Sequence, residues 1–164
     1  MLTTYFEVAS AIRRNLPEIR WIDLDKGQVN QLITGELDYD LPSIPCVLIS
    51  VPDEQWKSLS NKSQIGNGNL IVKLLLNLPS GTHASDPLLS MSVEATQLAE
   101  ALHESIIQVH GIEERTRVRR YPVAHLFCIE THYTTKLAYL RAVRQKPKPD
   151  PLITSNLNFP ISQQ

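Results

Sequence analysis

The chain has 164 residues and a mass of 18.5 kDa, which is enough for one domain with its own core. Hydrophobic residues make up 42% and charged residues 20%, and this composition excludes collagen-like, coiled-coil and disordered classes. The net charge of −1 hides an asymmetry, because residues 1–114 hold 7 basic and 15 acidic side chains whereas residues 115–164 hold 9 and 2. Such a split is typical of nucleic-acid binding, of a basic tail or of two unlike faces, unless the two parts fold together and neutralise each other.

The first half of the chain predicts one helix and two strands. Thr4 and Glu7 have capping-box spacing, apolar residues follow at helical intervals, and Pro17 ends a helix predicted over residues 4–16. Residues 19–24 indicate a short strand, and the mixed, acidic residues 28–43 are expected to form a loop. Residues 45–51 lie between two prolines and are β-branched and apolar, which predicts a buried strand.

The second half predicts a second, longer helix between strands. Residues 70–78 alternate with period two, after a hairpin turn expected at Gly66-Asn67-Gly68. Asp86 and Pro87 begin a predicted helix over about 87–110, and Gly111 ends it. Three further strands are expected at 117–121, 122–133 and 135–143, the last two joined near Thr134.

These elements predict an α+β fold, with a mainly antiparallel sheet packed against one long helix (about 87–110) and an N-terminal helix (about 4–16). Residues 1–144 are expected to form the single domain, and residues 145–164 a Pro-rich linker with a flexible or partner-docking arm. No run is long and apolar enough for a membrane span and no signal segment is apparent, so we expect a cytoplasmic protein. Cys46 and Cys128 both lie in apolar stretches, which favours two reduced, buried thiols over a disulfide.

We predict no catalytic, cofactor-binding or metal-ligating residues. A zinc-dependent hydrolase built on His125, Glu130 and His132 remains an alternative, but in a strand Glu130 and His132 share one face while His125 points to the other. The paired acids Asp23 and Asp25 lie beside turn residues, where solvent keeps both carboxylates ionised. The sequence also lacks a nucleophile elbow and a phosphate-binding loop.

The charge asymmetry predicts an interface instead. A head-to-tail oligomer meets itself through two different patches, and an acidic patch complements a basic one. The candidate subunit or partner interface consists of Glu36, Asp38, Asp40, Arg115, Arg117, Arg119, Arg120, Arg141 and Arg144. The alternative is a nucleic-acid-binding module on basic strands 115–144 with stacking by Tyr121, Tyr133 and Tyr139, against which the slightly acidic pI of about 6.5 argues.

The order of elements over residues 1 to about 144 resembles the tail-terminator, or tail-completion, proteins of long-tailed bacteriophages and prophages. The resemblance rests on the N-terminal helix ending at Leu16-Pro17-Glu18-Ile19, the segment 21–28, the strand 44–51, Trp56 before Gly66-Asn67-Gly68, the strand 70–78, the long helix and the closing strands. It implies a hexameric ring that caps the tail tube and contacts the head connector, formed in the host bacterial cytoplasm and retained in the virion tail. It implies neither a cofactor nor a catalytic residue.

Overall fold

The computed structural model describes residues 2–36, 41, 43–51, 54–60, 63–77 and 89–140, which form an α+β fold. The helices are α1 (Leu2–Asn15), α2 (Gln28–Thr34) and α3 (Leu89–Ile107). The strands are β1 (Trp21–Leu24), β2 (Cys46–Ser50), β3 (Glu54–Ser60), β4 (Ser63–Leu76), β5 (Ile112–Val123) and β6 (Leu126–Leu140). The expected linker and arm, residues 145–164, lie outside the described residues.

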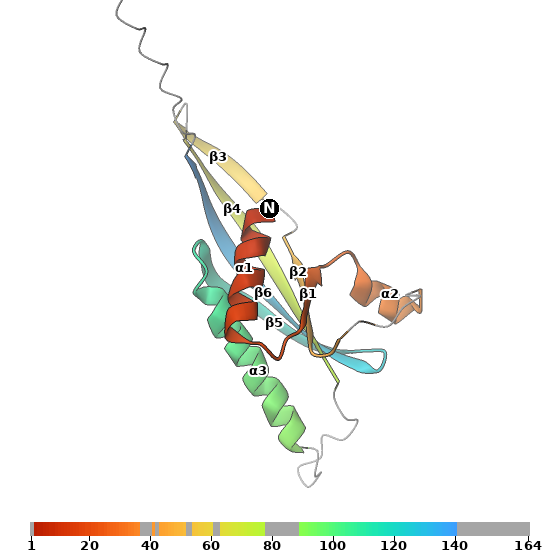
Figure 1. Ribbon diagram of the computed structural model, residues 1–164. Helices are drawn as coiled ribbons and strands as arrows, with labels where there is room; N and C mark the ends of the chain where they lie inside the picture. Colours follow the sequence, from red (N-terminus) through yellow and green to blue (C-terminus); the bar gives the residue numbers. More distant parts are fainter. Residues whose placement is uncertain are drawn as a thin grey trace, which may run out of the picture.

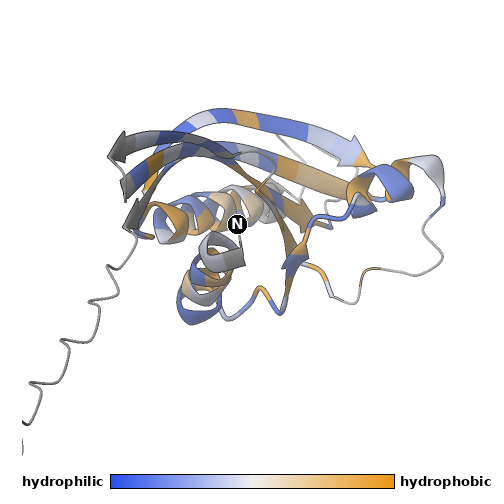
Figure 2. Cartoon of the chain, turned by 90° about the horizontal axis from the view of Figure 1, so that it is seen from above, coloured by the Kyte–Doolittle hydropathy of each residue, from blue (hydrophilic) through white to orange (hydrophobic). Residues whose placement is uncertain are grey.

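The six strands form one sheet in the order β1-β2-β4-β6-β5, and β3 also pairs with β4. Only the β1–β2 pair is parallel; the other pairs are antiparallel, as predicted. The strands β2 and β3 follow one another along the same side of β4, where β2 pairs with residues 71–75 and β3 with residues 63–68. Figure 2 shows α1 and α3 together beneath the sheet.

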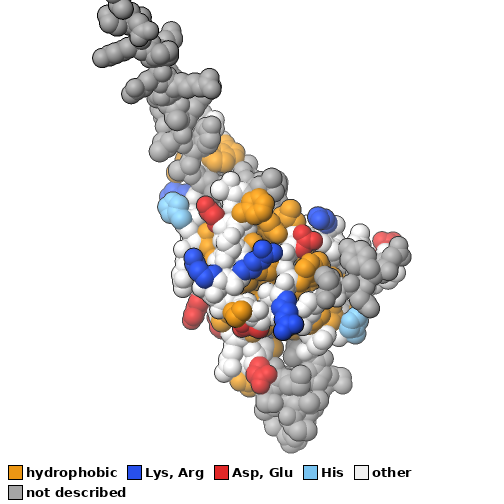
Figure 3. Space-filling model, viewed as in Figure 1, with side chains coloured by type: hydrophobic (Ala, Val, Ile, Leu, Met, Phe, Trp, Pro, Cys, Tyr) orange, Lys and Arg blue, Asp and Glu red, His pale blue; other side chains and the backbone are white. Residues whose placement is uncertain are grey.

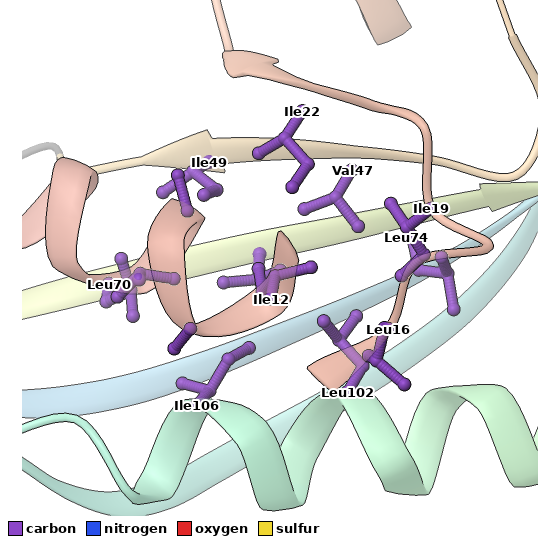
Figure 4. Close-up of a cluster of buried hydrophobic side chains, with 14 of the residues drawn as sticks. Ile12, Leu16, Ile19, Ile22, Val47, Ile49, Leu70, Leu74, Leu102 and Ile106 are labelled. Atoms are coloured by element: carbon purple, nitrogen blue, oxygen red, sulfur yellow. The ribbon is translucent and has the colours of Figure 1, made fainter. Parts of the chain in front are cut away.

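The face of the sheet that carries α1 and α3, called the helix face below, covers the larger core. Ile12 of α1 and Ile106 of α3 are fully buried against the strand residues Leu70 and Leu74. Figure 4 shows these side chains pointing toward one another between the helices and the strands. The apolar stripe predicted for the N-terminal helix is thus confirmed, and the buried side of α3 likewise explains why both helices pack on this face.

The opposite face, called the outer face below, has a smaller core. The alternation predicted for residues 70–78 is confirmed over residues 70–76, because Leu74 belongs to the helix-face core and Leu75 to the outer core. The strand ends at Leu76, and residue 78 lies outside the described residues. In β2, Val47 and Ile49 likewise point to the helix face while Cys46 and Leu48 point outward. The outer core is completed by residues from α2 and from the β5–β6 turn: Val29, Val123, Leu126 and Cys128.

Three expectations about element boundaries are wrong. Residues 28–34 form α2 rather than a loop, between Gly27 and Gly35, which both have positive φ. The segment Gly66-Asn67-Gly68 is not a turn but lies inside β4, and the strand predicted from 70 begins at Ser63. The break near Thr134 does not exist, because β6 runs without interruption through it and the turn lies at Ala124-His125 instead.

The predicted helix starts and ends are corrected in detail. The N-terminal helix already begins at Leu2, so Thr4 lies within its first turn, where it is buried rather than acting as the cap. The long helix ends at Ile107, three residues before the predicted end, and Gly111 with φ +86° follows in the turn to β5. The predicted start at Asp86-Pro87 lies outside the described residues.

Candidate subunit interface

The basic strand β5 is the last strand of the sheet, and it pairs with β6 alone among the described strands. Four arginines lie on it, and all four are exposed: Arg115, Arg117, Arg119 and Arg120. The register places Arg117 opposite His132 and Arg119 opposite Glu130, so these two share a face, as the two-residue period of a strand predicts. This face is the outer face, because Glu130 and His132 lie two and four residues after the outer-core residue Cys128 in β6 and therefore share its side of the strand.

Two irregularities in the pairing divide the arginines between the faces. The register shifts between Ile112 and Glu114 and again between Arg115 and Arg117. As a result Arg115 lies opposite Tyr133, a buried residue of the helix-face core, although its odd number alone would group it with Arg117. Arg120 lies opposite Ile129 and therefore also on the helix face.

Arg115 forms an ion pair within the chain. Its Nη1 lies 3.1 Å from Glu100 Oε2 and donates to both carboxylate oxygens, which ties β5 to α3. Beside this pair, His103 Nδ1 and Tyr133 Oη are 3.3 Å apart and the two rings stack. Burial, and then the positive charge of Arg115, lowers the pKa of His103, so its imidazole is neutral at physiological pH. Arg115 is therefore a structural contact in the folded chain.

Arg119 also has a partner in its own chain, Glu130. The Glu130 carboxylate accepts a hydrogen bond from the Tyr121 hydroxyl (2.9 Å), its Oε1 lies 2.8 Å from His132 Nε2, and Arg119 Nη1 lies 3.6 Å away. The Arg119 guanidinium also lies 5.6 Å from the centroid of the Tyr121 ring. A His132 ring with a proton on Nε2 donates this hydrogen bond to the Glu130 carboxylate.

These contacts set the charge state of Glu130. Burial by itself raises the pKa of the Glu130 carboxyl, but the hydrogen bonds from His132 and Tyr121 and the positive charge of Lys73 outweigh it. The pKa therefore lies below its ordinary value of 4.5, and Glu130 is ionised at neutral pH. Because the Glu130 side chain is only 9% exposed and that of Arg119 is 53% exposed, the positive group is the one that solvent meets.

A second ion pair on the outer face joins the sheet to α2. Lys73 lies opposite Glu130 in the register, and its Nζ is 2.6 Å from Asp25 Oδ2. The other oxygen of Asp25 accepts from the backbone N–H of Gly27 (2.9 Å), directly before α2. The carboxylate expected to be a solvated turn acid is thus a buried structural contact that holds the β1–α2 turn.

The acidic half of the predicted interface is described only at Glu36. This residue directly follows Gly35, and it is exposed. The remaining predicted residues Asp38, Asp40, Arg141 and Arg144 lie outside the described residues. The expected pairing of residues 36–40 with β5 of another subunit thus stays a prediction.

The tyrosines do not form one exposed stacking surface. Tyr133 is 1% exposed on the helix face, whereas Tyr121 lies on the outer face with its hydroxyl bound to Glu130. Burial is the largest cause of the raised pKa of both hydroxyls. The side chain of Tyr139 lies outside the description.

The histidine set of the hydrolase alternative is not brought together. His125 is exposed in the β5–β6 turn, whereas Glu130 and His132 lie side by side on β6. In the part of the chain that the structure describes, no three His, Cys, Asp or Glu side chains lie close enough together to hold a metal ion. None of the described helices has the length and apolar character of a membrane span.

The sequence did not predict the arm of the sheet. We define the arm as β3, residues 63–69 of β4 and residues 134–140 of β6, which pair over their whole length. Figure 1 shows these strands continuing beyond the ends of α1 and α3. The Trp56 ring lies across Gly66, which faces it in the register; a Cβ at Gly66 would be 2.9 Å from the ring. The only sequence signal was a glycine pair followed by a strand, which also fits a turn.

In comparisons with known proteins, no protein-family model matches the chain and no curated protein is significantly similar to it in sequence.

Proposed function

We propose that this protein is a ring-forming structural subunit of a bacteriophage or prophage tail, which completes the tail tube and joins it to the head connector. In this proposal its partners are further copies of itself in a hexameric ring, the tail-tube protein and the head–tail connector proteins. It acts through its surfaces, without a cofactor, and assembles in the cytoplasm of the bacterial host before it becomes part of the virion tail.

The observation that carries the proposal is the arm. None of the described side chains of β3, or of residues 64–69 of β4, belongs to either core cluster. Residues 55–58 of β3 are all exposed, including Trp56 at 43%. A sheet that extends beyond its core is marginally stable alone, and its outermost strand offers unpaired backbone groups. A neighbouring subunit that packs against the arm would bury its exposed side chains and pair the free backbone groups of its outermost strand.

The nucleic-acid alternative has no comparable support. Binding by a sheet needs exposed aromatic rings beside the basic side chains. Tyr133 is buried, and Tyr121 lies beneath Arg119 with its hydroxyl engaged by Glu130. Two of the four arginines of β5 also form ion pairs within the chain.

The proposal is tested on tail tubes purified from a phage or prophage encoded by the same genome. Electron microscopy should show rings of the added protein at one end of each tube. We expect Trp56→Ala to reduce the capped fraction, because the ring of Trp56 stiffens the arm over Gly66. The adjacent substitution Gln55→Ala, on the other face of β3, serves as the control. Tubes whose ends stay bare with the wild-type protein would overturn the proposal.

A further inference from the structure

We propose that copies of this chain associate head-to-tail, with the solvent side of α3 in one copy against the outer face of β5 in the next. The inference deepens the proposed function and rests on it only in taking a second copy as the partner. It takes α3 as the acidic surface, in place of the acidic residues predicted at positions 36, 38 and 40.

The solvent side of α3 carries acidic and aliphatic side chains along one stripe. We define the α3 surface as five exposed residues that recur at steps of four and three along one side of the helix: Val93, Gln97, Glu100, Glu104 and Ile107. Two large aliphatic side chains, Val93 (49% exposed) and Ile107 (44% exposed), flank the two carboxylates. These two side chains lie at opposite ends of the acidic stretch, so the carboxylates between them dominate this surface.

The charge of α3 is of one sign. Residues 89–107 contain three glutamates and neither lysine nor arginine. Glu100 forms an ion pair with Arg115, whereas Glu104 has no ion-pair partner among the described residues. In Figure 3, acidic side chains are visible along the course of α3. A partner for this surface must therefore offer positive charge.

The outer face of β5 offers that charge. We define the β5 surface as Arg117 and Arg119, which point to the same side of the strand. Arg117 is exposed and has no ion-pair partner in the part of the chain that is described. Arg119 stays 53% exposed above the nearly buried Glu130, so its guanidinium can accept a second carboxylate. The rigid strand, fixed by Tyr121 and Glu130, holds both groups in place.

The two surfaces cannot meet within one chain. The α3 surface lies on the helix face of the sheet and the β5 surface on the outer face. Only a second copy can bring one against the other, and the contact then joins unlike patches. Such a contact leaves one α3 surface and one β5 surface open at the two ends, so it propagates, and it closes a ring where the rotation between neighbouring copies divides a full turn.

The edge of β5 itself is a poor site for strand addition. The two register shifts and the charged side chains at 113–115 and at 117, 119 and 120 are devices by which proteins block the pairing of sheet edges. The contact therefore joins the two faces through side chains and does not extend the sheet.

The test uses two charge reversals in the full chain, Glu104→Lys on the α3 surface and Arg117→Glu on the β5 surface. Each variant alone places like charges together, and we expect its self-association to weaken about tenfold or more. An equal mixture should recover wild-type association, because the lysine introduced in one variant meets the glutamate introduced in the other, while the native pair forms at the next contact. Glu18→Lys and Arg20→Glu are matched controls, since both residues are exposed before β1.

Light scattering over a range of concentrations and salt gives the mass of each sample. Species larger than a dimer in the mixture, loosened by salt, support the head-to-tail contact. Variants that associate like the wild type, a mixture that stays dissociated, or a wild-type chain that is monomeric throughout would each overturn it. Capped tail tubes together with such a result leave the proposed function in place, whereas salt-sensitive association with bare tubes leaves this interface and removes that function.

Discussion

At the scale of single residues, Glu130 of β6 accepts hydrogen bonds and forms an ion pair, and these contacts link β6 to β5. Its carboxylate binds Tyr121, His132 and Arg119, which all lie on the outer face of β5 and β6. Because these groups donate hydrogen bonds or carry positive charge, they stabilise the ionised carboxylate in a nearly buried position. The network fixes the direction of Arg119, which is part of the proposed β5 surface.

Glu130 should therefore make stability depend on pH. Its pKa in the folded chain is lower than the ordinary value of 4.5, so the ionised carboxylate stabilises the fold at neutral pH. This contribution is lost as the pH falls through the acid range below 4.5. We expect Glu130→Gln to lower the free energy of unfolding by about 1–2 kcal/mol at about pH 7, and by less in acid.

Urea unfolding at a series of pH values measures this difference. Glu36→Gln is the control, because Glu36 is exposed and forms no ion pair among the described residues. A Glu130→Gln variant whose loss of stability is the same at neutral and acid pH would show that the network does not favour the ionised form.

At the scale of elements, the sequence predicted an element correctly where the residues that determine its structure lie within the element itself. The alternation in residues 70–76 was visible because β4 is buried on both faces there. The glycines at 66 and 68 could not be recognised as strand, because the reason for Gly66 is Trp56, on another strand and ten residues away. Similarly, α2 lacks a clear apolar stripe, and its position depends on Asp25 holding the preceding turn to Lys73.

The candidate site was predictable to a similar extent. The shared face of Arg117 and Arg119 followed from period two. Their partners did not, since Arg119 meets Glu130 and Arg115 meets Glu100 only through the register and through helix packing. At each of the two register shifts, β5 has one residue more than β6 opposite it, and no sequence pattern indicates these positions.

The turn from α3 to β5 depends on Gly111. This residue has φ +86°, and a Cβ there would lie 2.8 Å from the backbone oxygen of Lys136. The backbone N–H of Lys136 also donates to the Gly111 oxygen (2.7 Å), so β6 cannot move away without losing this bond. Gly111→Ala should lower the free energy of unfolding by about 2–3 kcal/mol, from the unfavourable φ and the close contact together.

Gly35→Ala separates these two contributions. Gly35 has φ +72°, but a Cβ there meets no atom within 4 Å, so only the unfavourable φ remains, at about 1 kcal/mol. Urea unfolding of both variants gives the difference. Equal losses would mean that the backbone near Lys136 shifts without cost.

At the scale of the whole molecule, one sheet separates two cores and belongs to both. Cys46 of β2 and Cys128 of β6 lie in the outer core, on either side of Leu75 of β4. Two strand spacings put their Cα atoms about 9.5 Å apart, too far for a disulfide, and both thiols are unpaired as predicted. Since the same strands carry the helix-face core on their other side, we expect the two cores to unfold together.

The two thiols report on this expectation. Burial raises the pKa of Cys46 to about 12 and that of Cys128 to about 11, and both side chains are fully buried. In the folded chain both are therefore protonated and inaccessible, so a thiol reagent can modify them only after the outer core opens. If α1, α2 and α3 leave the sheet in one step, each thiol becomes accessible only in the globally unfolded chain. The free energy of opening obtained from the modification of each thiol should then equal the free energy of global unfolding.

The measurement compares thiol modification with the loss of helix signal over the same range of urea concentrations. The single-thiol variants Cys46→Ala and Cys128→Ala separate the two sites, each judged against its own unfolding curve. Equal dependence on urea for modification and unfolding means one cooperative unit. Modification that does not depend on urea would instead mean that α2 opens alone, and the outer core would then contribute little to holding Arg117 and Arg119 in place on the sheet.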